Sequence, residues 1–171
     1  YNVYISPASG KTYLSDDFGN LDQIKIAINQ IENIKNSIIN SLTGTDYDKI
    51  MKIHDYLVDN IDYDSTYQAT GTYSVYGALI GKKCVCEGYA KSLKYLANQA
   101  GIQCEIMQGT GTNSSGQTES HAWNCVKIDG IWYEIDATWD DPIIVGNGYK
   151  ANVYKYRYFL KGTASFEKDH V

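Results

Sequence analysis

The first part of the chain carries apolar residues at every third or fourth position. One such stripe contains Leu21, Ile24, Ile28, Ile31, Ile34, Ile38 and Leu42. This spacing gives one apolar face to a helix that ends near Gly44. A coiled coil is the alternative, but the stripe covers only about three heptads. The pattern therefore favours a single helix that packs on a core.

A second apolar stripe begins after Asp46 and predicts another core-facing helix. Its members are Ile50, Ile53, His54, Leu57, Val58 and Ile61. A lone histidine in such a stripe is more often a hydrogen-bonded residue at the edge of the core than a catalyst. We interpret His54 in that way.

Two further helices are predicted in the middle of the chain. Residues 73–80 form a short one closed by Gly81, and residues 87–100 form a longer one that Gly101 stops. One face of the longer helix carries Tyr89, Leu93, Leu96, Ala97 and Ala100. This arrangement puts Cys86 at the N-terminus of a buried helix.

The rest of the chain has the pattern of strands. Residues 103–108 predict a strand and residues 109–118 a polar loop, and two more strands flank the turn dipeptide Asp129-Gly130. Residues 154–160 predict a further strand. Helices that precede the strands indicate an α+β fold rather than a wound parallel sheet.

A chain of 171 residues has the size of one domain. We predict a lead-in segment at residues 1–20, where turn residues dominate, followed by one domain over residues 21–171. The chain starts without Met and without a charged-then-apolar leader, which indicates a mature chain or an excised segment. No apolar run reaches the roughly 20 residues of a membrane span, so we expect no transmembrane segment.

Charge and composition narrow the range of partners. The formal net charge is −5 and the longest basic cluster is Lys82-Lys83, which argues against a nucleic-acid partner. A basic or polar substrate surface fits this net charge better. The chain has 16 Tyr against 3 Phe, with many Asn, Ser and Thr, a bias associated with secreted or cell-surface proteins. We therefore expect a secreted or surface location.

Neither the cysteines nor the acidic residues have the spacing of a metal site. Cys84 and Cys86 are closer than the usual C-x-x-C pair, and no second Cys/His pair follows. Cys104 and Cys125 either pair on adjacent strands or fill the core as small apolar residues, and we favour fillers. The segment Asp140-Asp141-Pro142 is more typical of a turn than of a calcium site. We expect no metal and no cofactor.

Cys86 is a candidate nucleophile. A thiol attacks as its thiolate, and the N–H groups and dipole of a helix N-terminus stabilise that anion. Gly88 in the first turn leaves room for a substrate carbonyl, and backbone N–H groups there are candidate oxyanion donors. Glu87 opposes thiolate formation, so a cationic partner is still required.

His121 is the candidate partner, and the turn at Asp129-Gly130 decides whether a carboxylate reaches it. Counting outward from that turn puts His121 and Asp136 on one face of two adjacent strands, as diagonal neighbours. Such neighbours are about 7–8 Å apart, a gap that two side chains bridge. A one-residue slip would place them on opposite faces. The register therefore predicts that they meet.

These three residues have complementary roles. His121 accepts the proton of Cys86 and later protonates the leaving amine, while Asp136 fixes the imidazole tautomer. The alternative is a buried Cys, an exposed His and a surface Asp that only happen to follow this order. Trp123, Trp132 and Trp139 lie around the same hairpin and either line a substrate groove or pack in the core. Core packing is favoured for Trp132.

Four sequence motifs contain Cys86, His121 and Asp136 or lie between these three residues: Cys84-Val85-Cys86-Glu87-Gly88-Tyr89-Ala90, Gly101-Ile102, His121-Ala122-Trp123-Asn124, and Gly130-x-Trp132-Tyr133-x-x-Asp136-x-Thr138-Trp139. Together they resemble the motifs of the transglutaminase-like superfamily. The ending Asp136-x-Thr138-Trp139-Asp140-Asp141-Pro142 is similar to that of a bacterial branch, as are Tyr76-Gly77-Ala78-Leu79 and Tyr158-Phe159-Leu160. The resemblance covers residues 46–170.

The resemblance implies a papain-like α+β core, in which the helix opened by the nucleophile packs on an antiparallel sheet that bears the His and Asp. Cys86, His121 and Asp136 occupy those motif positions. Members transfer an acyl group from Gln to an amine or hydrolyse peptide, isopeptide or related amide bonds. Related bacterial domains are commonly surface-exposed and attached to wall-binding or repeat modules. Cys125 stands where many relatives carry Glu.

The predicted function is a thiol acyl-enzyme that acts on protein or peptide amides, with hydrolysis favoured because a small domain shields a thioester poorly from water. A cross-linking transglutaminase is one alternative and a non-catalytic binding module is another. We expect the substrate to contact Trp123, Trp139, Tyr76 and Gly88. Cell-wall association is a further expectation for the substrate.

Overall fold

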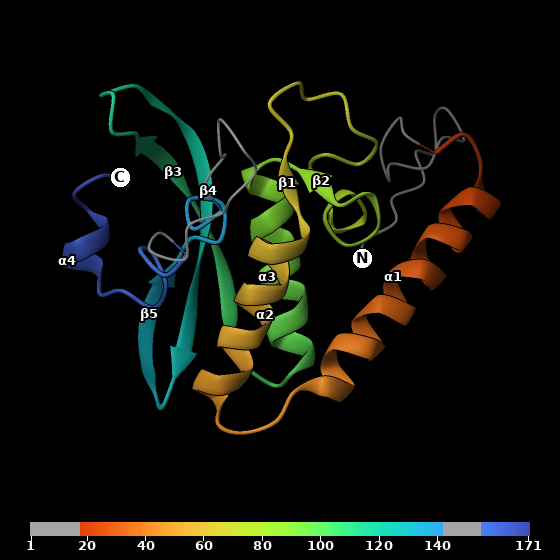
Figure 1. Cartoon of the computed structure of the whole chain (residues 1–171), viewed down its shortest axis with the longest axis horizontal. Coiled ribbons are helices and arrows are strands. Elements are labelled where there is room, and N and C mark those ends of the chain that lie inside the picture. Colours follow the sequence, from red (N-terminus) through yellow and green to blue (C-terminus); the bar gives the residue numbers. More distant parts are fainter. Residues whose placement is uncertain (1–17, 142–154) are drawn as a thin grey trace, which may run out of the picture.

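A computed structural model describes residues 18–141 and 155–171 (Figure 1). Residues 1–17 and 142–154 lie outside the described residues. They include most of the predicted lead-in, Pro142 of the predicted turn, and Tyr154 at the start of the last predicted strand. The division into a lead-in and one domain stays a prediction. Helices come first and an antiparallel sheet follows, so the predicted α+β class is confirmed.

The first two helices follow the two apolar stripes. Helix α1 spans Leu21–Ser41, and Ile24, Ala27, Ile31 and Ile38 are buried along it. Helix α2 spans Asp46–Asn60 and buries Ile50, Ile53, His54, Leu57 and Val58. The Thr45 side chain accepts from the Asp48 N–H, and the Asp48 carboxylate accepts from the Thr45 N–H. This capping box explains why α2 begins at Asp46.

A short parallel pair connects the helices to the candidate nucleophile. Strand β1 (Asp62–Tyr63) pairs with β2 (Lys83–Cys84), and a π-helical turn, η1 (Gly77–Gly81), precedes β2. The short helix predicted over residues 73–80 is thus present but displaced, because its hydrogen-bonded turn begins later and ends at Gly81. Helix α3 (Cys86–Gln99) follows directly, as predicted.

The sheet has three antiparallel strands in the order β3-β4-β5. Strand β3 spans Cys104–Thr112, β4 spans Thr118–Ile128, and β5 spans Ile131–Ile135. Asp129 and Gly130 both have positive φ, 50° and 83°, which is typical of the two-residue turn that matches strand twist. Ile128 pairs with Ile131. The predicted register is confirmed.

Two predictions about the strands are wrong. Residues 109–112 belong to β3 rather than to a loop, because they pair with β4 as far as Thr118. Residues 155–160 form turns and bends instead of a strand. Backbone contacts still join this part of the chain to β5 and to the residue that follows it. Lys161 forms an isolated bridge with Glu134 of β5, and the Tyr158 carbonyl accepts from the Asp136 N–H.

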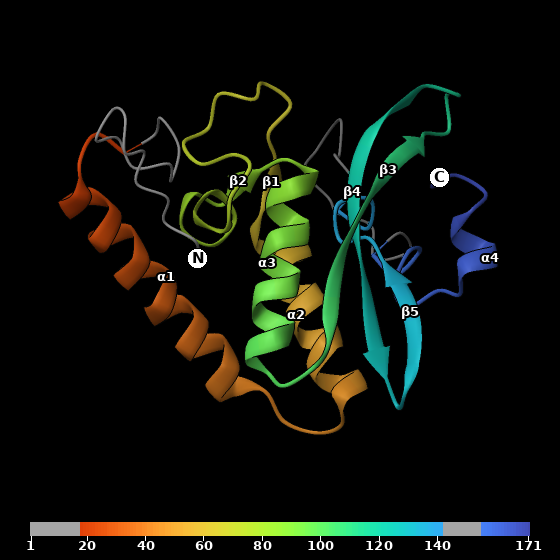
Figure 2. The same ribbon diagram turned by 180° about the vertical axis from the view of Figure 1, so that it is seen from behind.

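Helix α3 is the centre of the core. It packs on β3 and β4 and also on α2, while α1 lies on the side of α3 that is away from the sheet (Figure 2). Tyr89, Leu93 and Leu96 of α3 are fully buried in one cluster with Val126 and Ile135 of the sheet. Burial of each such side chain stabilises the fold by about 1.5–3 kcal/mol. Cys86 therefore opens a helix that both the sheet and α2 hold in place.

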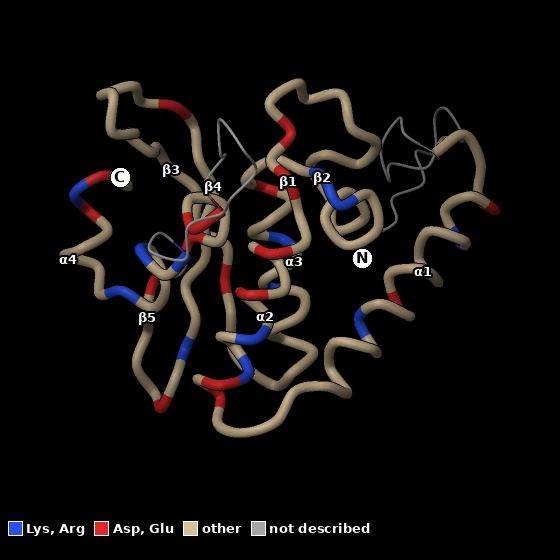
Figure 3. Tube along the Cα trace, viewed as in Figure 1, with Lys and Arg blue, Asp and Glu red and all other residues tan. Residues whose placement is uncertain are grey.

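Charged residues of both signs are interspersed along the described chain (Figure 3). A last short helix, α4, spans Thr163–Phe166. None of the helices in the described ranges has the length and apolar content needed to cross a membrane.

Candidate active site

Cys86 occupies the first position of α3 and is partly exposed. The preceding residue, Val85, is extended, and its N–H donates to the Thr72 carbonyl at 3.0 Å. The N–H groups of Gly88 and Tyr89 both donate back to the Val85 carbonyl. The sulfur thus lies at the positive end of a helix dipole, as predicted from the sequence.

Gly88 is required for close packing. A Cβ at this position would lie 2.6 Å from the Cys84 Cβ and 2.9 Å from the Thr72 carbonyl oxygen. Real contacts are never this short, so a larger residue would push α3 away from β2. Contact of Gly88 with substrate stays a prediction, because neither of the two cavities described below is lined by it.

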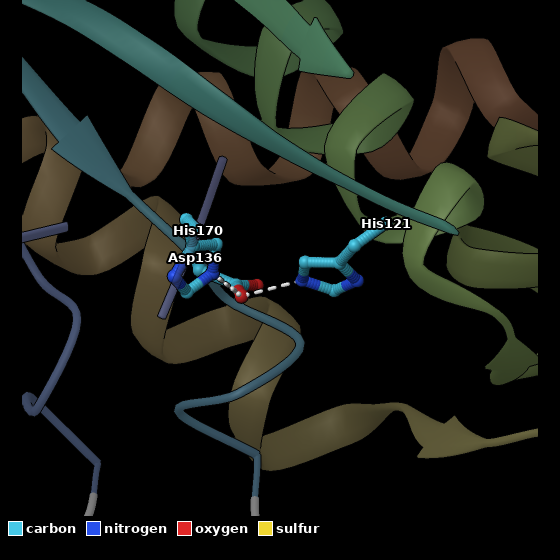
Figure 4. A group of neighbouring side chains, drawn as sticks. All are labelled: His121, Asp136 and His170. Atoms are coloured by element: carbon cyan, nitrogen blue, oxygen red, sulfur yellow. Dashed lines mark hydrogen bonds and ion pairs between the residues drawn. The ribbon is translucent and has the colours of Figure 1, made fainter. Parts of the chain in front are cut away.

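His121 and Asp136 meet as the hairpin register predicts. The Nε2 of His121, on β4, donates to the Oδ2 of Asp136 at 2.7 Å (Figure 4). Asp136 directly follows β5, and its Oδ1 accepts from the N–H groups of Thr138 at 2.9 Å and Trp139 at 3.2 Å. Two backbone donors therefore hold the carboxylate in place. The other ring nitrogen of His121 points away from Asp136.

The site favours a charged imidazole. Burial lowers the pKa of His121, but hydrogen bonds to Asp136 and to Cys86 outweigh it and raise the pKa to about 10. Burial raises the pKa of Asp136, and hydrogen bonds from His121 and His170 reverse this effect and lower it to about 2. Asp136 is therefore ionised at neutral pH and accepts from both rings. Cys86 contributes to the rise in the pKa of His121, and it lines one cavity together with His121.

Two cavities meet at His121. One of about 420 Å³ is lined by Cys86 and His121, and another of about 1120 Å³ is lined by His121 and Trp139. Both are lined by Tyr63, Tyr67, Glu119, Ser120 and His121. Because these shared residues join them, the two cavities form one groove that passes the candidate nucleophile. We call it the Cys86 groove.

The predicted substrate-binding residues are placed differently from one another. Trp139 lines the Cys86 groove and stacks on His121, with ring centroids 5.1 Å apart. Trp123 is buried and its Nε1 donates to Glu134 at 2.8 Å. Tyr76 packs against the core and meets the edge of the Phe18 ring. Of these three, only Trp139 lines the groove.

Sequence reasoning missed His170. This residue is buried, and its Nε2 lies 3.1 Å from the Asp136 Oδ2, the same oxygen that His121 contacts (Figure 4). Its Nδ1 lies 2.8 Å from the Oδ1 of Asp169. The segment around it shows no periodicity, and only the adjacent Asp-His pair was a signal of buried polar chemistry.

His121, Asp136 and His170 are also the described residues whose arrangement could hold a metal ion, since their ligand atoms lie within 4.8 Å of one another. Two imidazoles and one carboxylate are common ligands of zinc and iron. In this structure, however, both imidazole nitrogens lie at hydrogen-bond distance from the carboxylate oxygen. These contacts account for the cluster without an ion.

The remaining histidine and cysteines have structural positions. His54 is fully buried, and its Nε2 contacts the Asp140 Oδ2 at 3.1 Å. The prediction that His54 is hydrogen-bonded is therefore confirmed, but the residue lies inside the core and not at its edge. All four cysteines are free thiols. Burial raises the pKa of the Cys84, Cys104 and Cys125 thiols, which makes each a poor nucleophile at neutral pH.

Residues 33–137 match the sequence model of the transglutaminase-like superfamily. This match covers more than half of the chain. The chain belongs to the transglutaminase-like superfamily.

Its curated relatives include the Kyphoscoliosis peptidases of Homo sapiens and Mus musculus. They are 29% and 28% identical to this chain over 138 residues, which is 74% of the chain and 21% of each relative. The chain therefore spans about a fifth of the length of these two relatives.

Solved structures of similar fold include a TGase, with a TM-score of 0.56 at 18% identity over 81% of this chain and 37% of the other. A candidate cysteine protease from Cytophaga hutchinsonii gives a TM-score of 0.51 at 20% identity, over 70% of this chain and 43% of the other. At these identities the likeness shows the fold alone. It confirms the predicted transglutaminase-like architecture.

Proposed function

We propose that this member of the transglutaminase-like superfamily is a cysteine-dependent enzyme that hydrolyses amide bonds of proteins or peptides. The observation that carries the proposal is the position of His121. One of its ring nitrogens is hydrogen-bonded to the buried Asp136, and the ring interacts with Cys86. Cys86 and His121 line the same groove. A structural histidine has no need of such a groove.

The proposed reaction uses the three residues in sequence. Cys86 gives its proton to His121, and the thiolate attacks the carbonyl carbon of the amide to form a tetrahedral intermediate. His121 then protonates the leaving amine as the C–N bond breaks, which leaves a thioester on Cys86. Water, deprotonated by His121, attacks the carbonyl carbon of the thioester. The C–S bond then breaks, the carboxylic acid product leaves, and the Cys86 sulfur takes the proton back from His121. Asp136 holds the ring and stabilises its charged form throughout.

Backbone groups of α3 are the proposed oxyanion donors. The first amides of a helix have no partner within the helix, and they point along its axis toward the N-terminus. The Gly88 N–H is already donated to Val85. We therefore propose that the backbone N–H groups of Cys86 and Glu87 stabilise the negative charge that develops on the substrate carbonyl oxygen.

Hydrolysis is favoured over transfer because Cys86 is partly exposed, so water has access to a thioester on it. One feature favours transamidation as the second candidate. The part of the groove that contains Cys86 is also lined by the carboxylates of Glu87 and Glu119, which attract a protonated primary amine. The balance depends on which acceptor reaches the thioester first.

Mass spectrometry of peptide products tests the proposal. Gln-containing peptides are incubated, with and without a primary amine, with the wild-type protein and with Cys86→Ala, Asp136→Asn and Cys125→Ala. We expect cleavage or deamidation by the wild type, none by Cys86→Ala, and about 10²–10⁴-fold less by Asp136→Asn. Cys125→Ala is the matched control, since its thiol is also partly exposed, and it should retain full activity.

Other outcomes separate the alternatives. An amine adduct formed in place of the hydrolysis product would mean transamidation. A binding module would give no product with any peptide, and iodoacetamide would then alkylate Cys86 no faster than Cys125.

We also infer a secreted or surface location and protein substrates, including wall-associated ones. The inference rests on the tyrosine-rich composition and on the family resemblance. Protease shaving of intact cells that express the natural protein tests it. Protection of the domain from the added protease would contradict the inference.

A further inference from the structure

The segment that follows α4 is fixed along the free edge of β3. Thr110 and Val171 exchange backbone hydrogen bonds, with the Val171 N–H donating at 2.9 Å, and the Thr112 N–H donates to the Asp169 carbonyl at 2.8 Å. A Cβ at position 109 would lie 2.2 Å from the Val171 carbonyl oxygen, so only glycine permits this approach. We call residues 169–171 the C-terminal strap. It places His170 beside Asp136.

Both nitrogens of His170 face carboxylates. Nε2 contacts Asp136 at 3.1 Å, and Nδ1 contacts Asp169 at 2.8 Å, whose other oxygen accepts from the Tyr158 hydroxyl. An ionised carboxylate only accepts hydrogen bonds, so a ring that satisfies both contacts carries a proton on each nitrogen. In that doubly protonated form His170 bears a positive charge.

The surroundings of His170 suit a cation. The rings of Trp139, Phe166 and Trp123 have their centroids 4.4, 4.5 and 4.9 Å from that of His170, and aromatic rings attract positive charge. Two titratable rings face it, that of Tyr158 with its centroid 5.3 Å away and that of His121 with its centroid 5.4 Å away. The imidazoles of His121 and His170 both contact the Oδ2 of Asp136, so they compete for the negative charge of this carboxylate.

We propose that His170 is a positioning residue for the reaction. It holds the Oδ2 of Asp136 in line with His121, and its positive charge lowers the proton affinity of His121. The inference rests on the proposed function, in which His121 must both take a proton from Cys86 and release one to the leaving amine. An imidazolium held by an unshared buried carboxylate releases its proton reluctantly. Because His170 also interacts with the Asp136 carboxylate, that carboxylate stabilises the charged form of His121 less, and His121 releases its proton more readily.

Two variants separate the hydrogen bond from the charge. His170→Phe keeps an aromatic ring in the cluster but removes both, whereas His170→Gln restores an N–H donor toward Asp136 without a charge. We measure the titration of His121 by NMR, the rate of Cys86 alkylation against pH, and kcat and KM. In both variants the pKa of His121 should rise by about one unit. His170→Phe should lose about tenfold in kcat with little change in KM, and His170→Gln should recover part of that loss.

His54→Gln is the matched control, because His54 is an equally buried histidine that contacts a different carboxylate, Asp140. It should lower Tm and leave the titration of His121 unchanged. The proposal is overturned if neither His170 variant moves that titration and the loss of kcat follows the loss of Tm. A shifted titration in a protein that cleaves no amide would instead support the charge sharing and contradict the proposed function.

Discussion

The side-chain amide of Asn124 donates to the backbone carbonyl of Ala90 at 2.9 Å. The same amide also donates to the Glu105 carbonyl at 3.2 Å, so it joins α3, β4 and β3. Ala90 lies one helical turn beyond Cys86, and Asn124 follows His121 on β4. This buried amide therefore fixes the position of α3, and with it Cys86, relative to His121 on β4.

Removal of that amide should loosen both the fold and the site. Asn124→Ala leaves buried carbonyls short of a donor, and we expect the free energy of unfolding to fall by about 1–3 kcal/mol in urea titrations. Asn124→Asp has the same shape without the donor and should lose a similar amount. An Asp variant as stable as the wild type would show that the hydrogen bond contributes nothing.

The stability contributed by His121 should depend on pH in a defined direction. Its pKa in the folded protein is about 10, above the ordinary value of 6.5, because its contacts with Asp136 and Cys86 outweigh burial. The stabilisation is complete below about pH 6.5 and is lost as the pH rises through about 10. Urea unfolding of the wild type and of His121→Gln, compared over this range, should show a difference that shrinks with rising pH. A difference that grows with pH would contradict the assigned charge.

The core of the site was predictable because local rules determine it. The dipeptide Asp129-Gly130 favours one turn type, and that turn fixes which face His121 shares. The glycine stop and apolar spacing likewise fixed the extent of α3, and with it the placement of Cys86 at a helix start.

His170 and the end of β3 were not predictable by such rules. Residues 109–112 read as a loop because Gly and Thr alternate there, and only pairing with β4 and the C-terminal strap makes them a strand. Nothing within the strap shows where it docks. Its position depends on contacts with residues about 60 positions earlier in the chain, such as Thr110, and such contacts leave no local periodicity.

Gly109→Ala tests whether the strap depends on that close approach. The added methyl group meets the Val171 carbonyl, so the strap must move, and we expect a loss of about 1–3 kcal/mol in unfolding free energy. Faster hydrogen exchange of the Val171 amide should accompany the loss. Gly162→Ala is the control, because nothing lies within 4 Å of a Cβ there. Equal effects of the two substitutions would contradict a specific role for Gly109.

Glu119 should influence which substrates the groove accepts. It is exposed and lines both parts of the Cys86 groove, so its carboxylate is available to a basic residue near the scissile bond. An exposed ion pair is worth up to about 1 kcal/mol, and Glu119→Gln should therefore raise KM for Lys-containing peptides by about two- to fivefold. KM for neutral peptides should stay constant, and added salt should reduce the difference. Glu167→Gln, which alters an exposed carboxylate outside the groove, should change neither. Equal effects of Glu119→Gln on basic and neutral peptides would mean that this carboxylate shapes the groove instead of attracting charge.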